Sequence, residues 1–198
     1  MSRVVLASGN KGKVREMNAL LAPTGLEVLP QTQFGVAEAV EDGLTFVENA
    51  LIKARNACRH TGLAAIADDS GLEIDALQGA PGIYSARFAG EGADDTQNWQ
   101  KVLEELEGIP LAERGARFQC LLVYLRHAED PTPVIAQGSW QGTILESPAG
   151  ENGFGYDPIF FLPDQRCSAA QLAPELKNSL SHRGQALQRL LQLLSARS

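Results

Sequence analysis

The chain has 198 residues, of which 44% are hydrophobic, and a formal net charge of −7. This length suits a single domain spanning residues 1–198 and built as two lobes, with enough apolar residues for an ordinary globular core. The acidic balance argues against a broad nucleic-acid surface, which needs a basic patch. It leaves open a nucleotide site, since a few cations converging on one place are enough to bind a nucleotide.

Membrane and secretory signals are not evident. The N-terminus lacks a basic-then-apolar leader pattern, and no apolar run approaches the ~20 residues that a membrane span needs. Cys58, Cys120 and Cys167 are odd in number, far apart and without CxxC spacing. Such thiols are typical of a reducing compartment. We therefore expect a cytoplasmic protein with no membrane partner.

The first predicted elements are a strand at Val4–Ala7 and the polar turn Ser8-Gly9-Asn10-Lys11-Gly12-Lys13. Apolar residues then recur at helical spacing until Pro23 closes the helix. A strand, a glycine-bearing turn and a helix N-terminus form an anion cradle. The two lysines and the asparagine favour phosphate as the ligand. The P-loop pattern GxxxxGK[ST] is absent, and a solvated tight turn is the alternative.

A second strand at 27–29 and an irregular connection at 31–40 lead to the next helix. Thr45 and Glu48 have the spacing of a capping box, which predicts a helix from there to about His60.

One stripe of this helix carries Asn49, Lys53 and Asn56, at helical spacing. A lysine on a helix is usually a solvated charge. Lys53 is of more interest because its stripe offers amides rather than a carboxylate, and Glu41 lies just upstream. A second stripe consists of small residues that allow close packing: Ala50, Ala54 and Ala57.

The apolar run 62–66 has strand length and ends abruptly in Asp68 and Asp69. Ligands usually bind at the carboxyl ends of strands in α/β sheets. Adjacent strand residues point to opposite faces, so both carboxylates face one ligand only if the strand has already broken. One can hold a metal while the other bonds a turn at Ser70-Gly71. A simple polar turn is the alternative.

The middle of the chain alternates between predicted strands, turns and one helix. In order these are a half-exposed strand at 72–77, a rigid turn at 79–82, a helix capped at 94–95, a long strand at 118–125, its antiparallel partner at 134–140 and a short strand at 142–145.

Two further regions have the composition of a binding site. Residues 148–155 are too rich in glycine and proline for helix or regular strand, and 156–161 enter a strand. Phe154, between two glycines, is a good stacking platform for a flat ligand. The last helix begins near His182 and Arg183, where the helix dipole disfavours positive charge, so these two donors indicate a ligand.

Seven motifs, in order along almost the whole chain, resemble those of the inosine triphosphate pyrophosphatase family, most of all its bacterial members. They are Ser8-Gly9-Asn10-Lys11-Gly12-Lys13, Glu48-Asn49-Ala50, Lys53-Ala54-Arg55, Ala67-Asp68-Asp69-Ser70-Gly71-Leu72, Gly79-Ala80-Pro81-Gly82, Gly153-Phe154-Gly155-Tyr156-Asp157-Pro158 and Ser181-His182-Arg183-Gly184.

The resemblance implies an elongated α/β fold, in which a mixed sheet with flanking helices forms two lobes around a central nucleotide cleft. It implies a homodimer that uses Mg²⁺ to hydrolyse ITP, dITP and XTP to the monophosphate and pyrophosphate.

The resemblance also implies roles for individual residues. Asp69 is the proton acceptor and a metal ligand, Glu41 the second metal ligand and Lys53 a catalytic cation that holds the triphosphate. The other triphosphate-binding residues are Ser8, Gly9, Asn10, Lys11, Gly12 and Lys13. The nucleoside-binding residues are Ser70, Phe154, Gly155, Tyr156, Asp157, Lys177, His182 and Arg183.

These residue types suit the reaction. Attack of water on the α-phosphorus needs a positioned base and neutralised charge, and Mg²⁺ needs only one or two carboxylates besides phosphate and water. No covalent nucleophile is evident, because no cysteine lies in a motif and GxSxG is absent.

Base selectivity is expected to depend on donors. Inosine and xanthine carry an acceptor at purine position 6, where adenine carries a donor, and Arg183 and His182 can donate. Such a pocket can reject the mismatched base by up to ~10⁴–10⁵. Guanine shares the 6-carbonyl, so its exclusion depends on its 2-amino group, for which the sequence indicates no residue.

Two other functions remain open. One is a pyrophosphatase of related fold that acts on modified pyrimidine or methylated nucleotides. The other is a nucleotide sensor without turnover, against which the presence of Asp69, Glu41 and Lys53 argues.

Overall fold

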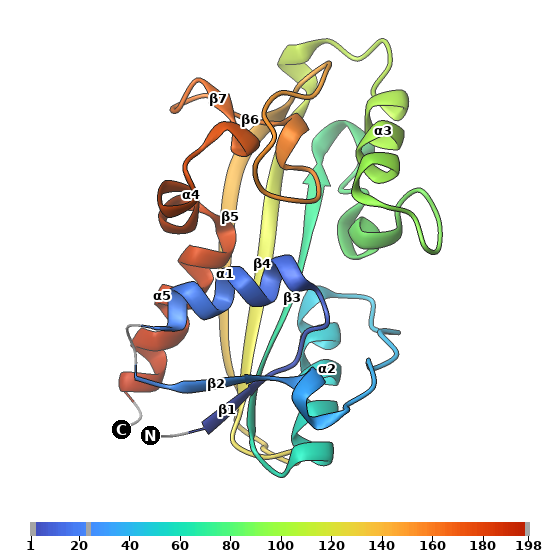
Figure 1. Cartoon of the computed structure of the whole chain (residues 1–198). Helices are drawn as coiled ribbons and strands as arrows, with labels where there is room; N and C mark the ends of the chain where they lie inside the picture. Colours follow the sequence, from blue (N-terminus) through green and yellow to red (C-terminus); the bar gives the residue numbers. More distant parts are fainter. Residues whose placement is uncertain (1–2, 23–24, 197–198) are drawn as a thin grey trace. The chain divides into compact units, whose positions relative to one another are not determined.

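The computed structural model describes residues 3–22 and 25–196, so the predicted helix end at Pro23 lies outside the described residues (Figure 1). Its mixed sheet has seven strands in the order β2-β1-β3-β4-β5-β6-β7, which confirms the α/β class. The strands are β1 (Arg3–Leu6), β2 (Glu27–Pro30), β3 (Ala64–Ile74), β4 (Gly115–Leu125), β5 (Val134–Ile144), β6 (Phe160–Leu162) and β7 (Cys167–Ser168). The α-helices are α1 (Lys11–Leu21), α2 (Phe46–Thr61), α3 (Asp95–Glu105), α4 (Pro174–Leu180) and α5 (His182–Ser195).

The chain forms two compact units, each with hydrophobic clusters of its own. Unit 1 consists of Met1–Asp69, Cys120–Gly138 and Arg183–Ser198, and unit 2 of Ser70–Gln119 and Ser139–His182. Within the described residues, no helix has the length and apolar character that crossing a membrane requires.

In unit 1, β1 lies between β2 and β3 and is parallel to both (Figure 1). The two faces of β1 are covered by different helices, as strand alternation requires. Val4 and Leu6 belong to the cluster that includes residues of α1 and α5. Val5 and Ala7 belong to the cluster that includes the small-residue stripe of α2. The predicted stripe of alanines on α2 is therefore confirmed as a packing face.

The order β2-β1-β3 creates a topological switch point between β1 and β3. The chain leaves β1 for β2 on one side and then crosses to β3 on the other, with α1 and α2 as the two connections. In open α/β sheets, ligands bind outside the carboxyl ends of the strands at such a point. Leu6 is in register with Ile66, so the segments that follow these two residues meet at one edge.

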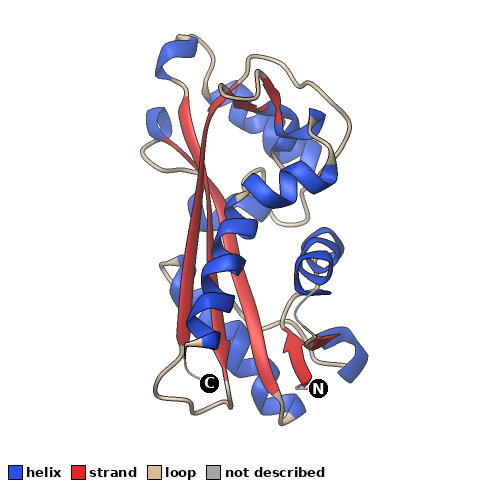
Figure 2. Ribbon diagram, turned by 90° about the vertical axis from the view of Figure 1, so that its left-hand side faces the viewer, coloured by secondary structure: helices blue, strands red, loops and turns tan. Residues whose placement is uncertain are grey.

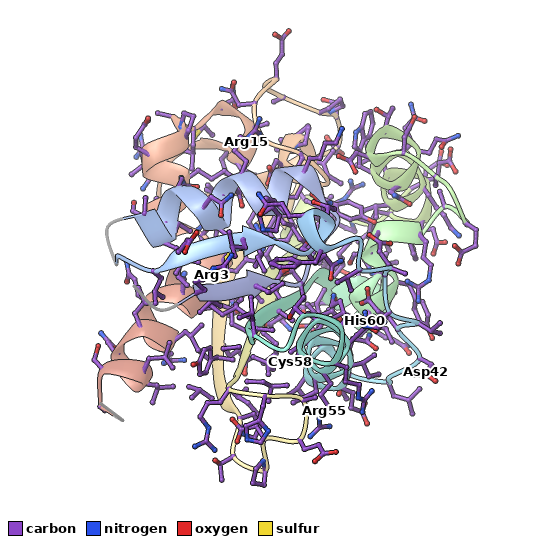
Figure 3. All side chains as sticks on the ribbon, turned by 60° about the horizontal axis from the view of Figure 1, so that its bottom comes forward. Arg3, Arg15, Asp42, Arg55, Cys58 and His60 are labelled. Atoms are coloured by element: carbon purple, nitrogen blue, oxygen red, sulfur yellow. The ribbon has the colours of Figure 1, made fainter. Side chains whose placement is uncertain are left out.

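Helix α2 separates a buried side from an exposed side. Cys58 is buried against the sheet, whereas His60 near the end of the helix is exposed (Figure 3). The helix begins where predicted: Thr45 Oγ1 accepts from Glu48 N at 3.3 Å. The Glu48 carboxylate accepts from Leu44 N at 2.9 Å and from the Thr45 hydroxyl at 2.8 Å, so it also holds the residues before the helix.

In unit 2, the core is aromatic where β4, β5 and β6 adjoin. The Phe118 ring lies 4.4 Å from that of Phe160, and Trp140 lies 5.7 Å from Phe160, measured between ring centroids. Helix α3 adds Val102, and its C-cap residue Leu106 packs in the same cluster; both are completely buried. Asp94 caps α3 in a full capping box with Gln97, as the sequence predicted for residues 94–95.

Two strand boundaries differ from the prediction. β3 continues through Ser70-Gly71 to Ile74, so the predicted turn there is wrong. Its apolar residues Leu72 and Ile74 are completely buried in the core of unit 2, which favours continued strand. β5 likewise joins the two strands expected at 134–140 and 142–145. Together with β4, these are the three longest strands, drawn in red in Figure 2.

Three shorter elements also differ from the prediction. Part of the irregular connection at 31–40 is a 3₁₀ turn, Gln31–Phe34. The strand expected at 156–161 is a 3₁₀ turn, Asp157–Ile159, followed by β6. Helix α4 was not predicted, because its seven residues are too few to show a helical apolar period.

Candidate active site

The turn after β1 has the geometry of a helix N-cap. Asn10 Oδ1 accepts from Lys13 N at 3.0 Å, and Asn10 O accepts from Val14 N at 2.9 Å. Ser8 Oγ accepts from Asn10 N at 3.3 Å, which holds the strand end against the cap. The first N–H groups of a helix have no acceptor within that helix and carry partial positive charge. The predicted helix N-terminus is therefore present at the β1–β3 switch point, and its binding of phosphate stays a prediction.

Lys53 lies between two carboxylates. Its Nζ is 3.1 Å from Asp69 Oδ1 and 3.0 Å from Glu41 Oε2. The residue stripe predicted on α2 positions the segment that carries Glu41. Asn56 Nδ2 donates to Ala37 O at 2.9 Å, and Asn49 Oδ1 accepts from Gly43 N at 2.9 Å.

The amides of α2 thus hold the segment before the helix, and Lys53 is not a solvated charge. Its carboxylate partners come from outside its own helix, which is why they could not be read from the stripe.

Asp68 has a different set of partners from Asp69. Its Oδ2 lies 3.0 Å from Lys13 Nζ and 3.6 Å from Arg183 Nη2. Arg183 also pairs with Glu16 of α1. The side chain of Asp68 is only 1% exposed and that of Arg183 3%. The suggestion that one of the two aspartates bonds a turn at Ser70-Gly71 is therefore wrong for Asp68: the strand continues there, and Asp68 instead joins a buried charge network between β3, α1 and α5.

The two aspartates have opposite shifts in pKa. Burial opposes ionisation of Asp68, but the positive charges of Lys13, Arg183 and Lys53 outweigh it, so its pKa lies below the usual range. For Asp69 burial dominates and raises the pKa, although Lys53 and Lys13 act in the other direction. Asp68 is therefore ionised at neutral pH, and Asp69 is the stronger base of the two.

The group around Asp69 meets the needs of a magnesium site. Asp69 Oδ2 is buried and has no hydrogen-bond partner among the residues that the structure describes. The same residues contain no cluster of three or more histidine, cysteine or acidic side chains able to hold a metal. Mg²⁺ usually takes one or two carboxylates and completes its shell with phosphate oxygens and water. Asp69 and Glu41 have the right chemistry for that arrangement, whereas a site made entirely of protein ligands is not supported.

A second set of predicted residues meets within unit 2. Lys177 Nζ lies 2.7 Å from Asp157 Oδ2 and 4.9 Å from the centroid of the Phe154 ring. The same carboxylate oxygen accepts from Phe154 N at 2.9 Å. A Cβ on Gly153, which has φ of +80°, would lie 2.1 Å from that oxygen, so this position requires glycine. Lys177 on the unpredicted α4 and the loop 153–157 therefore form one buried, charge-paired cluster.

His182 and Arg183 are adjacent in sequence but differ in environment. The His182 ring stacks on Phe118, with centroids 4.8 Å apart and planes at 12°. Arg183 belongs to the charge network of unit 1 described above. The roles assigned to them in reading the base stay predictions, and the structure adds that the Arg183 guanidinium already has two carboxylate partners.

Cys58 is a poor nucleophile. Burial raises the pKa of the Cys58 thiol to about 11, so it remains protonated at neutral pH. All three cysteines are free. The expectation that no covalent intermediate forms stays a prediction.

Sequence reasoning did not identify Glu16 or Ser85, which bond residues of the predicted site. Glu16 pairs with Arg183 across 167 residues of sequence, and the Ser85 carbonyl accepts from the Tyr156 hydroxyl across 71. No local pattern marks such partners. In the sequence, the glycines at 153 and 155 were the one indication that side chains pack closely against the 153–157 loop.

A family model described as the Ham1 family matches residues 4–193. The chain belongs to the Ham1 family. It is 59% identical over 198 residues to a dITP/XTP pyrophosphatase of Vibrio parahaemolyticus, covering 100% of this chain and 99% of that protein. It is 60% identical over 194 residues to a protein of the same name from Shigella flexneri, covering 98% of each.

Among solved structures, a HAM1 protein from Coxiella burnetii matches with a TM-score of 0.91 and 49% identity, covering 99% of this chain and 100% of that one. These matches confirm the family resemblance read from the sequence and the mixed α/β fold.

Proposed function

We propose that this Ham1 protein hydrolyses the non-canonical purine nucleotides ITP, dITP and XTP to the monophosphate and pyrophosphate. The observation that carries the proposal is the contact of Lys53 with both Asp69 and Glu41 beside the β1–α1 turn. It occurs in a chain about as long as relatives that are named dITP/XTP pyrophosphatase and are 59% and 60% identical to it. These relatives favour the proposal over enzymes for modified pyrimidine or methylated nucleotides, and over a sensor without turnover.

The chemistry divides among the residues of unit 1. The β1–α1 turn and Lys13 bind phosphate oxygens through N–H groups and positive charge. Asp69, whose pKa is raised, accepts the proton of the water that attacks the α-phosphorus. Lys53 keeps Asp69 and Glu41 in place and offsets their charge. Glu41 and Asp69 are the proposed ligands of Mg²⁺, which when bound supplies positive charge to the triphosphate.

The nucleoside roles proposed for residues of unit 2, and separately for Arg183 of unit 1, rest on the family resemblance. Phe154 offers an aromatic face for the purine, and Lys177 and Asp157 offer polar groups beside it. Ser70, Gly155, Tyr156 and His182 complete the proposed nucleoside set.

The decisive experiment is a substrate panel. Purified protein with Mg²⁺ is given ITP, XTP, dITP, GTP and ATP, and pyrophosphate release is measured for each. We expect turnover of the first three well above that of GTP and ATP, and loss of turnover when EDTA removes the metal. Equal turnover of all five would contradict the proposed substrate class, and no release from any would contradict the activity.

Two associated proposals concern assembly and location. The family resemblance implies a homodimer, and light scattering that shows a monomer at micromolar concentration would contradict it. The proposed location is the cytoplasm, whose reducing conditions suit the free cysteines.

A further inference from the structure

Ser85 is a buried polar junction in unit 2, outside every motif assigned to the nucleotide. It lies in the 3₁₀ turn Gly82–Arg87 and is 8% exposed. Its hydroxyl accepts from Leu72 N at 2.9 Å and donates to Gly82 O at 2.7 Å. The hydroxyl therefore holds the turn against β3, two residues after Ser70.

The same residue receives the side chain of Tyr156. The phenolic hydroxyl of Tyr156 donates to Ser85 O at 2.7 Å, and Tyr156 is 5% exposed. Burial, followed by the charge of Asp95, raises the pKa of this phenol, so it stays a donor at neutral pH. The polar end of Tyr156 is thus directed to the protein interior and engaged there.

One more hydrogen bond connects the same region to the 153–157 loop, and two others hold that region together. Asp95 Oδ2, in the first turn of α3, accepts from Gly155 N at 2.7 Å. Asn98, 3% exposed, accepts from Ala89 N at 2.8 Å and donates to Ala86 O at 3.2 Å, which ties the residues after Ser85 to α3. The segment 82–98 therefore holds the loop at two residues, Gly155 through Asp95 and Tyr156 through Ser85.

We propose that Ser85 and the side chain of Tyr156 are positioning groups for nucleotide binding. The Tyr156 hydroxyl anchors the 153–157 loop instead of contacting the ligand, so the place of Tyr156 in the nucleoside set rests on its backbone alone. This inference rests on the proposed function, in which Phe154 and Asp157 of that loop bind the nucleoside. The anchor acts at the nucleoside end and not on the reacting phosphorus. Its loss therefore weakens binding of substrate and transition state alike, which raises KM and leaves kcat nearly unchanged.

The kinetic test uses Tyr156→Phe and Ser85→Ala. Each removes hydroxyl hydrogen bonds and keeps most of the packing volume. We expect KM for ITP to rise about 2- to 10-fold, the size of one net hydrogen bond, with kcat within about 2-fold of wild type. The double variant is expected to show less than the product of the two single effects, because the Ser85 hydroxyl holds the turn that carries the carbonyl to which the Tyr156 hydroxyl donates.

A matched control is Thr61→Val at the end of α2. The Thr61 hydroxyl also donates to a carbonyl, Ala57 O at 2.7 Å, and accepts one N–H, that of Leu63 at 3.2 Å. This variant loses the same kind of bonds in unit 1 and is expected to keep the wild-type KM. If KM rises in Thr61→Val as much as in Tyr156→Phe, the inference is overturned. A fall in kcat at constant KM in Tyr156→Phe or Ser85→Ala would overturn it as well.

Hydrogen–deuterium exchange separates failure of the anchor from failure of the proposed function. The N–H groups of Phe154 and Gly155 are expected to exchange faster in Tyr156→Phe and Ser85→Ala than in wild type, and at the wild-type rate in Thr61→Val. Unchanged exchange in the first two variants would overturn the anchor whatever the activity. Faster exchange in a protein without pyrophosphatase activity would leave the anchor standing and remove its role in nucleotide binding.

Discussion

Asp68 and Asp69 are neighbours in the chain, yet they belong to two differently built regions of unit 1. On the α1 and α5 side, Asp68 is enclosed by Lys13 and Arg183, and its pKa is lowered. On the α2 side, Asp69 has Lys53 as its cation and Glu41 as a second anion close by, and its pKa is raised. Two carboxylates whose environments move their pKa values apart are suited to different tasks. The first region stores fixed charge, and the second holds a base.

The largest effect is expected from Asp69→Asn. This change keeps the shape of the side chain and removes the proposed base and metal ligand. Turnover of ITP should fall by at least ~10²–10⁴, the usual loss for a general base. Steady-state kinetics at saturating Mg²⁺ measures it, and near-wild-type turnover would contradict the role given to Asp69.

Stability should distinguish the two regions in the opposite order to activity, with Asp68→Asn as the more damaging change. Asp68→Asn leaves Lys13 and Arg183 without their buried carboxylate, which should lower the free energy of unfolding by about 3–5 kcal/mol. Asp69→Asn should leave the free energy of unfolding unchanged or raise it. The reasons are that folding disfavours the ionised form of Asp69 and that Lys53 still has Glu41 as an ion-pair partner. Urea unfolding of both variants measures this difference, and equal destabilisation would contradict it.

The pH dependence of stability sharpens this comparison. The lowered pKa of Asp68 contributes stability above the ordinary value of 3.8, and this is lost as pH falls through the folded-state pKa. The raised pKa of Asp69 contributes stability below 3.8, and this is lost as pH rises through the folded-state pKa. Asp68→Asn should therefore become less stable relative to wild type as pH rises toward 3.8, with no further change above it. Asp69→Asn should become more stable relative to wild type as pH rises above 3.8. Parallel shifts in both variants would show that the two environments are alike.

Lys13 and Lys53 provide the positive charge of the two regions. Lys13→Ala and Lys53→Ala should each lower kcat/KM about 10- to 100-fold, as expected when a charged hydrogen bond is lost. The factor should be the same for ITP and ATP, since contacts to phosphate carry no information about the base. A changed ITP-to-ATP ratio in either variant would place that lysine at the nucleoside.

The smallest expected effect on activity is a change in base preference on substitution of Arg183. This residue belongs to the Asp68 region and is also predicted to contact the base. Arg183→Ala should reduce the preference for ITP over ATP, whereas Phe154→Ala should weaken both substrates in parallel. If Arg183→Ala lowers both by one factor, its partnership with Glu16 and Asp68 is its main role.

Local patterns predicted much of this site. Strand alternation predicted that Asp68 and Asp69 face opposite sides. Helical spacing predicted that Asn49, Lys53 and Asn56 lie on one stripe. The Asp-Ser-Gly turn was wrong because Leu72 and Ile74 are buried in the unit 2 core, and that tertiary packing overrides the local turn preference. Partners far apart in sequence could not be predicted, because ion pairs such as Glu16 with Arg183 leave no periodic trace.

The fate of the attacking oxygen tests the central claim most directly. ITP is hydrolysed by the wild-type protein in water labelled with heavy oxygen, and the products are analysed by mass spectrometry. Attack on the α-phosphorus with Asp69 as base predicts that the label enters the monophosphate and that pyrophosphate is unlabelled. Label in pyrophosphate or in free phosphate would mean that water attacks another phosphorus, and the site described here would not be that of a nucleotide pyrophosphatase acting at the α-position.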